Sequence, residues 1–594
     1  MFWIAQTIPW ELAPTILTFA AASARVANPD ASASIDFIQV LAGLLVALVA
    51  LCQSILFLPQ NTGGRFLLFA FALWPLGSFF YQTSASGASQ YLPGGIWAGP
   101  KPSSKHPIEE LILQAQKDYD RLIKSQSQDI EGAEQEYRRR YSRDPPPGFD
   151  KWFAYAQSKQ SLLIDDYDMI NEDLKPFWQV SPQRLLESID HVSSFEHLAL
   201  RKCGFTKGEY HGQGGGWIVE DLGHKLLEEV KGDIPDVEFA FDVVDEPRVI
   251  ITQQMLEAGG VAKPEFYNAE HRSIWSRVTA SCQNDTSIVY KPKVYDYGIP
   301  FVQDWYQAKD VCQHPEFSEL HGFFASPETC ILTDAPIPVL SQAAPTTFGD
   351  IMYPSPWYPA KVDQGVYKPE EDPDWDQKSN TLYWAGSTTG SHSWNGSWRQ
   401  SQRQRFVQLI QTMKETKHHY LEQDTPASWK DYEAIEDHSA LYDVKLTAII
   451  QCDEADCEEQ REYFDVHDKE DREQQFKSRF IFDVDGNSFS GRFYTLLQSR
   501  SVVLKQTVLR EWHDERLIPW VHYVPVSMGM QELPEIMRYL TSAEGEKWAK
   551  QIAEQSRDGH EKMLRQVDMT VYLYRLMLEL ARIMDPERKV ERLT

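Results

Sequence analysis

The stretch FIFDVDGNSFSGRF, residues 480–493, has the pattern of a buried strand that ends in a glycine-bearing loop, with Arg492 opening a helix. A second stretch of the same kind is LYWAGSTTG, residues 382–390, where small residues follow a strand. Further strand-like runs are VEFAFDVV at 237–244, Ile337–Leu340 and Ser501–Lys505. Helical or turn-rich segments separate these runs, and this alternation predicts an α/β fold.

Length and charge limit the classes of protein. A chain of 594 residues exceeds what one hydrophobic core usually carries, so two or more domains are expected. The hydrophobic fraction of 42% is enough to form a buried core in each domain, which excludes a wholly disordered chain. The net charge is −28, which disfavours binding to nucleic-acid backbones, so we expect no nucleic-acid partner.

The first 82 residues predict a membrane anchor of two to three hydrophobic helices. Phe37–Leu58 carries no charge and is long enough to span a bilayer, whereas Phe66–Tyr81 and Phe2–Ala22 are weaker candidates. Arg65, between the two better runs, places that loop in the cytosol and the rest of the chain in the lumen. The alternative is a buried helical hairpin in a soluble protein.

Sequons and cysteines agree with a lumenal body. Asn284 and Asn395 each begin an N-glycosylation triplet. Beyond Cys52, six cysteines permit three disulfides of open connectivity, and six buried free thiols are the alternative. Cys452 and Cys457 have acidic neighbours and no nearby histidine in sequence, so we expect no zinc site there.

Residues 83–150 read as a stem followed by a helical segment. Ser, Gly and Pro are frequent in 83–105, and a helical pattern begins at Pro107. Arg138–Arg140 is interpreted as a solvated helix face. Residues 364–378 resemble an interdomain connection, and residues 546–594 fall in a long C-terminal helical pattern.

The two strand-to-helix loops are candidate phosphate sites. The backbone N–H groups and hydroxyls of Gly386, Ser387, Thr388 and Thr389 can donate to an anion. Guanidinium groups from the next helix can neutralise it, and a plain turn is the alternative. The candidate cations and the second loop's candidates are Arg399, Arg403, Arg405, Gly491 and Arg492, with Ser490 and Glu511 as additional ones.

Carboxylates suggest two further readings. Asp483 and Asp485 have a D-x-D spacing that could hold a divalent metal, or they could simply flank the turn. Asp242 and Asp245 end an apolar strand, where a carboxylate is well placed for catalysis but also common in a turn. Histidines at 211, 392 and 522 stand in unrelated contexts and indicate no other mechanism.

Taken in order, these segments resemble glycosyltransferase family 90, which includes fungal capsule-associated proteins and Rumi-type protein O-glucosyltransferases. The resemblance covers roughly residues 106–580, and HPIEELI and PPPGFDKW favour the fungal, membrane-anchored branch. The matching stretches are FAFDVVDEPRV (239–249), PIPVLSQAAPTTFGDIMYPSPW (336–357), LYWAGSTTG (382–390), RQRF (403–406) and DGNSFSGRF (485–493) through PWVHYVPV (519–526).

The resemblance implies a GT-B fold, in which two Rossmann-like domains face a cleft. Residues 151–375 would form the acceptor-side domain with Asp245 as base, and residues 376–545 the domain that binds the UDP-sugar. It also implies that residues 386–389, Arg403 and Arg492 contact the diphosphate. This sequence inserts residues 391–398 relative to Rumi-type members, so Arg399 and Arg405 stay alternatives, and Ala385 replaces an arginine of those members.

The expected function is therefore an inverting transfer from a UDP-sugar to a glycan or glycoprotein hydroxyl without a catalytic metal. UDP-xylose is the first choice of donor, because the fungal branch resembles capsule xylosyltransferases, and UDP-glucose is next. The expected location is the Golgi or another secretory-pathway membrane, with the catalytic region in the lumen. The alternatives are a metal-dependent transferase using Asp483 and Asp485, or an inactive member that serves as a membrane-bound scaffold or glycan-binding protein.

Overall fold

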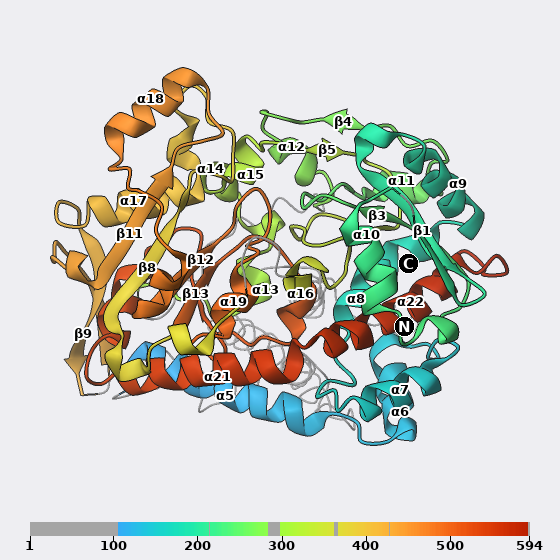
Figure 1. Ribbon diagram of the computed structural model, residues 1–594, viewed down its shortest axis with the longest axis horizontal. Coiled ribbons are helices and arrows are strands. Elements are labelled where there is room, and N and C mark those ends of the chain that lie inside the picture. Colours follow the sequence, from blue (N-terminus) through green and yellow to red (C-terminus); the bar gives the residue numbers. More distant parts are fainter. Residues whose placement is uncertain (1–104, 213, 283–297, 361–365, 427, 592–594) are drawn as a thin grey trace, which may run out of the picture. The chain divides into compact units, whose positions relative to one another are not determined.

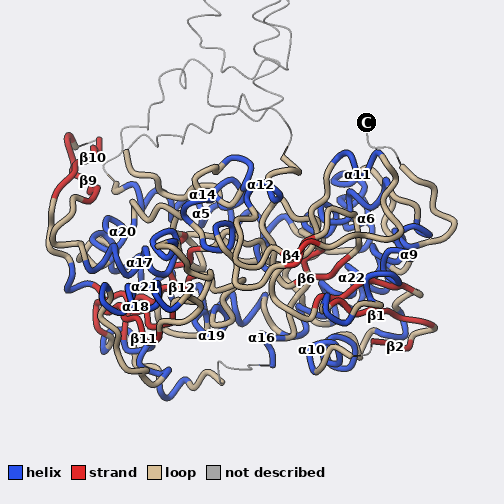
Figure 2. The backbone as a smooth tube through the Cα atoms, turned by 90° about the horizontal axis from the view of Figure 1, so that it is seen from above, coloured by secondary structure: helices blue, strands red, loops and turns tan. Residues whose placement is uncertain are grey.

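Two β-sheets with helices packed around them organise the chain beyond residue 104 (Figure 1). The computed structural model describes residues 105–212, 214–282, 298–360, 366–426 and 428–591. All of these belong to one compact unit that begins at Ser104. Strands of the two sheets gather in two separate regions of this unit, with helices and loops between them (Figure 2). The α/β class is confirmed.

The first sheet has the strand order β2-β1-β3-β6-β7. Strands β3, β6 and β7 are parallel, whereas β1 pairs antiparallel with both β2 and β3. A Rossmann-like domain was expected here, and the sheet is parallel from β3 through β7, with β1 and β2 added at one side as an antiparallel hairpin. The bounds are β1 (Leu200–Thr206), β2 (Glu209–Gly212), β3 (Val237–Asp242), β6 (Val339–Ser341) and β7 (Ile351–Met352).

The second sheet is parallel throughout, with the order β11-β8-β12-β13-β14. Strand β13 is buried at every residue, as expected for a parallel sheet that is covered on both faces. The chain leaves β8 toward β11 on one side and returns to β12 on the other, so the order reverses between β8 and β12. The bounds are β8 (Ser379–Ser387), β11 (Tyr442–Ala448), β12 (Ser478–Val484), β13 (Val502–Gln506) and β14 (Val524–Pro525).

The terminal helices of the described chain do not stay with their neighbours in sequence. Helix α5 (Pro107–Ser125) was expected beside a stem, but Ile108 and Ile112 are buried in the core of the second sheet. Helix α21 (Glu546–Met563) lies alongside α5 (Figure 1), and α22 (Gln566–Met584) then packs on the first sheet. Residues 546–594 were expected to form C-terminal helices. Helices α21 and α22 join the half of the unit that holds the second sheet to the half that holds the first sheet.

The buried apolar face of α22 is built around one ion pair. Arg575 and Glu579, one turn apart, are both buried and lie 3.0 Å from each other. The guanidinium also stacks near the rings of Phe149 and Trp152, on helix α7 (Phe149–Ser158). A charged group in a core needs such a partner, so α22 is fixed to the first half by charge as well as by apolar contact.

The remaining elements are short or cover the two sheets. They are α6 (Ile130–Tyr141), α8 (Asp168–Leu174), α9 (Pro182–Ser193), α10 (Trp217–Asp221), α11 (Gln253–Glu257), α12 (Trp275–Val278), α13 (Trp305–Ala308), α14 (Phe317–Leu320), α15 (Gly322–Ala325), α16 (Trp357–Ala360), α17 (Gln402–Gln411), α18 (Glu454–Tyr463), α19 (Phe493–Leu497), α20 (Leu533–Leu540), β4 (Tyr267–Asn268), β5 (Ile331–Leu332), β9 (His418–Thr425) and β10 (Ser428–Ala434). The tri-arginine run lies on α6, paired with acidic side chains.

A hydrophobic cluster between the sheets fixes the halves against each other. Phe323, Phe324 and Phe348 of the first half pack with Val508 and Met528 of the second. Burying aromatic and aliphatic side chains from both halves in one cluster disfavours large independent motion. The space between the sheets is therefore a defined cleft.

Cysteine pairing is settled for the described residues. Cys282 bonds to Cys312 and Cys452 to Cys457, while Cys203 and Cys330 are buried free thiols. Two disulfides therefore form, where the sequence allowed three.

The predicted membrane anchor, residues 1–82, and the sequon at Asn284 lie outside the described residues. None of the helices that the structure describes has the length and apolar character needed to cross a membrane. The second sequon residue, Asn395, is exposed in a turn.

Candidate functional site

A cavity of about 420 Å³ lies where the two sheets face each other. Its volume is within the range of small-molecule sites. The first half supplies residues that follow β3 and β6, and the second supplies the loop after β12, so carboxyl ends of parallel strands meet here. The wall is formed by Gly215, Trp217, Ile218, Val243, Val244, Asp245, Gln342, Trp357, Phe489 and Gly491.

Asp245 is the carboxylate in this wall. It is half-buried, and desolvation, followed by the charge of neighbouring Glu246, raises its pKa to about 7. An ordinary aspartate is a weak base, but a carboxyl with a pKa near neutrality is matched to general-base catalysis. The sequence analysis placed the base at this position, and the structure gives it a stronger basicity than the residue type implies.

The turn that presents Asp245 is fixed from below by a buried ion pair. Asp242, at the end of β3, lies 2.9 Å from Nε of Arg248 and accepts a hydrogen bond from Val244 N–H at 3.1 Å. The backbone N–H groups of Arg248 and Val249 donate to Asp350 at 2.9 and 2.7 Å. Asp242 therefore has a structural role, while Asp245 faces the cavity.

The loop of small residues lies at the reversal point of the second sheet. Gly386 and Ser387 end β8, and Thr388 exchanges two 2.8 Å hydrogen bonds with the backbone of Ile450. A Cβ on Gly386 would lie 2.7 Å from the indole of Trp384, so only glycine fits there. Ligands of parallel α/β sheets bind at such reversal points, so this loop is the expected place for one.

Two arginines converge on that loop without a carboxylate partner. Arg403 donates from Nε to the carbonyl of Asp485 at 2.9 Å, and from Nη1 to Thr389 Oγ1 and to the carbonyl of Ser387. Arg492 donates to the carbonyl of Ala385 at 3.4 Å. Neither guanidinium forms an ion pair with any carboxylate of the described chain.

Their electrostatics differ from those of other buried arginines here. Burial, followed by the charge of Arg492, lowers the pKa of Arg403 to about 10, and burial also lowers the pKa of Arg492. Arg248, Arg510 and Arg575 are buried too, but each has an aspartate or glutamate partner. Two neighbouring desolvated cations without a carboxylate partner favour an anion as ligand.

The structure places the other two candidate arginines elsewhere. Arg399 pairs with Glu459 at 2.6 Å on the protein surface. Arg405 donates to the carbonyls of Leu320 and Met528, and burial lowers its pKa to about 10. Of the three arginines that the sequence left open, Arg403 is the one that touches the loop.

Asp483 and Asp485 point into protein interactions. Asp483 lies 3.1 Å from Nζ of Lys505 and accepts a hydrogen bond from Ser490, and Asp485 lies 3.3 Å from Nε2 of His321. The described residues place no third metal-binding side chain close enough to form a site with them. Asp483 and Asp485 therefore form contacts inside the protein, with Lys505 and His321 respectively, and Ser490 supports Asp483.

Glu511 is buried at the edge of β13. It accepts a hydrogen bond from Tyr358 and lies 3.8 Å from Lys505, and burial raises its pKa to about 7. Tyr358 comes from the first half and Lys505 from the second, so Glu511 orients Tyr358 across the two halves.

Sequence reasoning missed the aromatic part of the wall. Trp217 and Trp357 lie with ring centroids 5.9 Å apart. Gly491 must approach Trp357 closely, because a Cβ there would lie 2.6 Å from the indole nitrogen. The glycine-rich run 212–216, next to Trp217, is a signal that could have marked this approach.

A larger cavity of about 760 Å³ lies between α5 and residues 510–520. Its wall carries many carboxylates, which would repel a diphosphate. They are Asp118, Asp166, Asp168, Glu172, Asp304, Asp514 and Glu515. The smaller cavity, whose wall holds Asp245 and Gly491, the residue before Arg492, is the better candidate.

Comparison with known proteins points to one family. Residues 327–592 match the model of Glycosyl transferase family 90, a segment that holds the loop, Arg403 and Arg492. The O-glucosyltransferase rumi homolog of Aedes aegypti is 33% identical over 116 residues, which are 19% of this chain and 28% of that protein. Protein O-glucosyltransferase 3 of Rattus norvegicus is 30% identical over 107 residues, 18% of this chain and 21% of that protein. These matches span less than a third of either relative.

Proposed function

We propose that this chain, whose residues 327–592 form a glycosyl transferase family 90 domain, transfers a sugar from a nucleoside-diphosphate donor to an acceptor hydroxyl. The relatives named as O-glucosyltransferases support a glycosyl transfer. The observation that carries the proposal is the pair Arg403 and Arg492, which lack a carboxylate partner in the described chain and lie at the reversal point of the parallel sheet.

The two arginines fit the departing diphosphate. When the bond between the sugar and the phosphate oxygen breaks, the electron pair stays on the diphosphate, and Arg403 and Arg492 neutralise the added charge. The hydroxyl groups of Ser387 and Thr389 can add donors at the same place, whereas the N–H of Thr388 already donates to the carbonyl of Ala448.

Asp245 completes a single displacement. The acceptor oxygen attacks the anomeric carbon from the face opposite the diphosphate, and its proton passes to the Asp245 carboxylate. One bond to the anomeric carbon forms as the other breaks, so the configuration inverts. The cavity between Asp245 and Gly491 has room for the sugar.

We further propose a GT-B type arrangement with a UDP-sugar donor. The second half would bind the nucleotide and the first half the acceptor. UDP-xylose is the first donor to test, on the strength of the fungal-branch resemblance, and UDP-glucose is second, since the named relatives are O-glucosyltransferases. The acceptor would be a glycan or glycoprotein hydroxyl.

The proposed transfer needs no metal on the diphosphate. Arg403 and Arg492 supply the positive charge, while the carboxylates of Asp483 and Asp485 face Lys505 and His321. Residues 1–82 are proposed as the membrane anchor, with the described residues in the lumen of the Golgi or another secretory compartment. The exposed Asn395 and the two disulfides are in keeping with that location.

The test is release of UDP by the full chain, purified in detergent, with a panel of UDP-sugars and acceptors in the presence and absence of EDTA. Turnover of one sugar that persists in EDTA and is lost in Asp245→Asn supports the proposal. UDP binding without turnover of any donor would assign the chain to the inactive, glycan-binding alternative. Loss of turnover in EDTA that added Mg²⁺ or Mn²⁺ restores would favour the metal-dependent alternative.

A further inference from the structure

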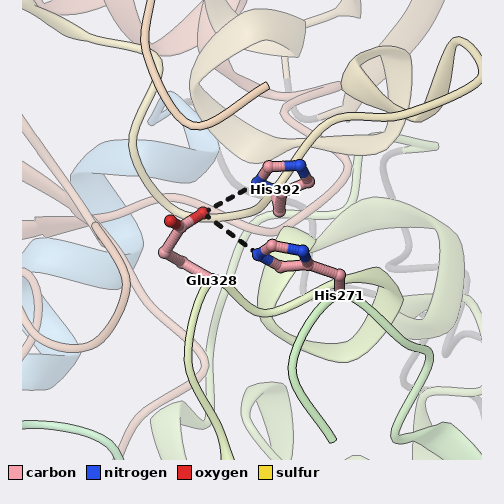
Figure 3. Close-up of side chains that lie close together, drawn as sticks. All are labelled: His271, Glu328 and His392. Carbon is pink, nitrogen blue, oxygen red and sulfur yellow. Dashed lines mark hydrogen bonds and ion pairs between the residues drawn. The ribbon is translucent and has the colours of Figure 1, made fainter. Parts of the chain in front are cut away.

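Three side chains from separate segments meet outside the cavity (Figure 3). His271 follows β4, Glu328 lies between α15 and β5, and His392 lies in the loop after β8. Oε2 of Glu328 is 3.0 Å from Nδ1 of His392 and 3.8 Å from Nε2 of His271. Within the described residues, this is the single group of three or more such side chains with metal-ligand spacing.

The backbone holds both histidines against one short segment. The N–H of His271 donates to the carbonyl of Pro327 at 3.0 Å, and the N–H of His392 donates to the carbonyl of Ser326 at 2.7 Å. His271 has a φ of 56°, in the left-handed region that non-glycine residues adopt uncommonly. The two imidazoles stack with centroids 3.5 Å apart and turn toward the same carboxylate (Figure 3).

Hydrogen bonding leaves this arrangement incomplete. His392 has carboxylates at both nitrogens, with Glu328 at Nδ1 and Asp453 at Nε2, 3.1 Å away. A neutral imidazole carries one N–H, so one nitrogen lone pair would face a carboxylate lone pair. On His271, Nε2 is buried without a hydrogen-bond partner among the described residues. A cation between the three side chains removes both conflicts.

We propose that His271, Glu328 and His392 bind a divalent transition-metal ion, with Zn²⁺ the best fit. Zinc accepts two imidazole nitrogens and a carboxylate oxygen, with water in the fourth position. At about 2.0–2.1 Å from the metal, tetrahedral ligand atoms lie roughly 3.4 Å apart, and two measured edges of the cluster, 3.0 and 3.8 Å, bracket that length. The two rings are 15° from parallel, so one of them must rotate on binding to bring both in-plane nitrogen lone pairs onto one ion.

Asp453 has the position of an outer partner. Metal-bound histidines donate their second N–H to a carboxylate, which fixes the tautomer and strengthens the ligand. Asp453 N–H donates to the carbonyl of Ser393 at 2.9 Å, and the Cys452–Cys457 disulfide closes the same turn. These contacts hold the backbone at Asp453, while its side chain is 67% exposed and reaches Nε2 of His392.

The metal would tie the two halves together. His271 and Glu328 belong to the first half, and His392 follows the Gly386–Thr389 loop of the second. The site is separate from Asp245 and the arginines, so its role is to hold that loop. The inference does not rest on the proposed function.

The test uses the full chain in detergent, with a histidine-free affinity tag, stripped of metal by a chelator that is then removed. Zn²⁺ is titrated by calorimetry, and Co²⁺ is added as a spectroscopic probe of coordination by nitrogen and oxygen. We expect one tight Zn²⁺ equivalent and a higher thermal midpoint with the metal. Both should be lost in His392→Ala and in His271→Gln.

Two further variants separate a metal site from a merely structural cluster. Asp453→Asn should keep the site but weaken Zn²⁺ binding about 10–100-fold, because the outer carboxylate is lost. His438→Ala is the control, since His438 pairs with Glu436 at 2.8 Å outside the cluster, and it should bind Zn²⁺ like the wild type.

Equal Zn²⁺ binding by wild type, His271→Gln and His392→Ala would overturn the proposal. The proposal would also be overturned if the wild-type chain binds no Zn²⁺ and NMR near pH 7 shows that both nitrogens of His392 carry protons. In that case an imidazolium, and not a metal, pairs with the two carboxylates. If His392→Ala does not fold, the Asp453→Asn affinity still decides, because an unchanged value contradicts metal ligation by His392.

Discussion

Replacing Asp245 by asparagine tests the proposed chemistry most directly. The side chain keeps its size and its place in the cavity wall, but it can no longer take a proton. Removal of a general base typically lowers the rate about 10²–10⁴-fold. We therefore expect kcat to fall by that factor, while the affinity for UDP, which we propose is bound by the other half, stays unchanged.

The pH dependence of the wild type follows from the pKa of Asp245, which burial and the neighbouring Glu246 raise to about 7. The ionised fraction is about 0.9 at pH 8 and about 0.1 at pH 6, so kcat should fall roughly tenfold between them. The residual activity of Asp245→Asn should not follow this limb, because the titrating group is absent.

The contribution of Asp245 to the stability of the folded chain should change with pH in the direction opposite to kcat. A carboxyl whose folded-state pKa is raised binds its proton more tightly in the folded chain than in the unfolded one, so its contribution falls as pH rises from about 4 through about 7. Asp245→Asn should therefore raise the thermal midpoint at pH 8, and the gain should shrink as the pH is lowered below 7.

The assay is UDP release with the donor found active, measured from pH 5.5 to 8.5, beside calorimetric UDP binding and a thermal melt of each variant. An Asp245→Asn variant that is folded and retains wild-type kcat would refute the assignment of the base. A wild-type rate that is flat down to pH 5.5 would show that the carboxylate in use has an ordinary pKa, and the argument from burial would fail.

Four other changes have definite expected outcomes. Arg403→Gln and Arg492→Gln should each weaken UDP binding about 10–100-fold in calorimetry, since a charge-assisted hydrogen bond contributes about 1.5–3 kcal/mol. Arg399→Gln is the control, because Arg399 pairs with Glu459 at the surface. Equal losses of affinity in all three variants would contradict the proposed anion site. Gly491→Ala should raise the donor KM, because its Cβ would lie 2.6 Å from the Trp357 indole, whereas Gly232→Ala meets nothing within 4 Å and should be neutral; a normal KM would show that the wall is not used. Asp242→Asn should destabilise the chain by about 3–5 kcal/mol, seen as a lower thermal midpoint, because Arg248 is left buried without its partner; an unchanged midpoint would show that the pair does not support this turn. Replacing Cys282 and Cys312 together by serine should also lower the melting temperature, by the equivalent of about 3 kcal/mol for a bridge spanning 30 residues, and no change under non-reducing conditions would indicate that this disulfide does not form.

Local pattern was enough to find the strands and loops of the site. The runs at 237–244, 382–390 and 480–493 contain β3, most of β8 and most of β12, because apolar β-branched and aromatic residues bounded by turn-forming residues determine a strand over a few residues. Local pattern failed where partners are distant in sequence. Helix α5 was assigned beside a stem, yet its buried face, with Ile108 and Ile112, packs with the second sheet.

The choice among arginines shows the same limit. Arg399, Arg403 and Arg405 lie within seven residues, and nothing local distinguishes them. The fold directs Arg399 to Glu459, Arg405 to two carbonyls and Arg403 to the loop. The spacing of Asp483 and Asp485 left two alternatives, a metal site or a turn. Only the fold shows that Lys505 lies against Asp483 and that His321 lies against Asp485.

The sequence by itself determined the α/β class, the resemblance to one family and the residues at the ends of the key strands, because these depend on short-range periodicity and turn chemistry. The tertiary structure alone decided which charges remain without a partner. Burial raises the pKa of Asp245 to about 7. The fold leaves Arg403 and Arg492 without a carboxylate partner in the described chain. It also places His392, for which the sequence indicated no role, beside His271 and Glu328. Desolvation and pairing depend on the folded surroundings of each group, which include segments distant in the sequence, and no local pattern records them.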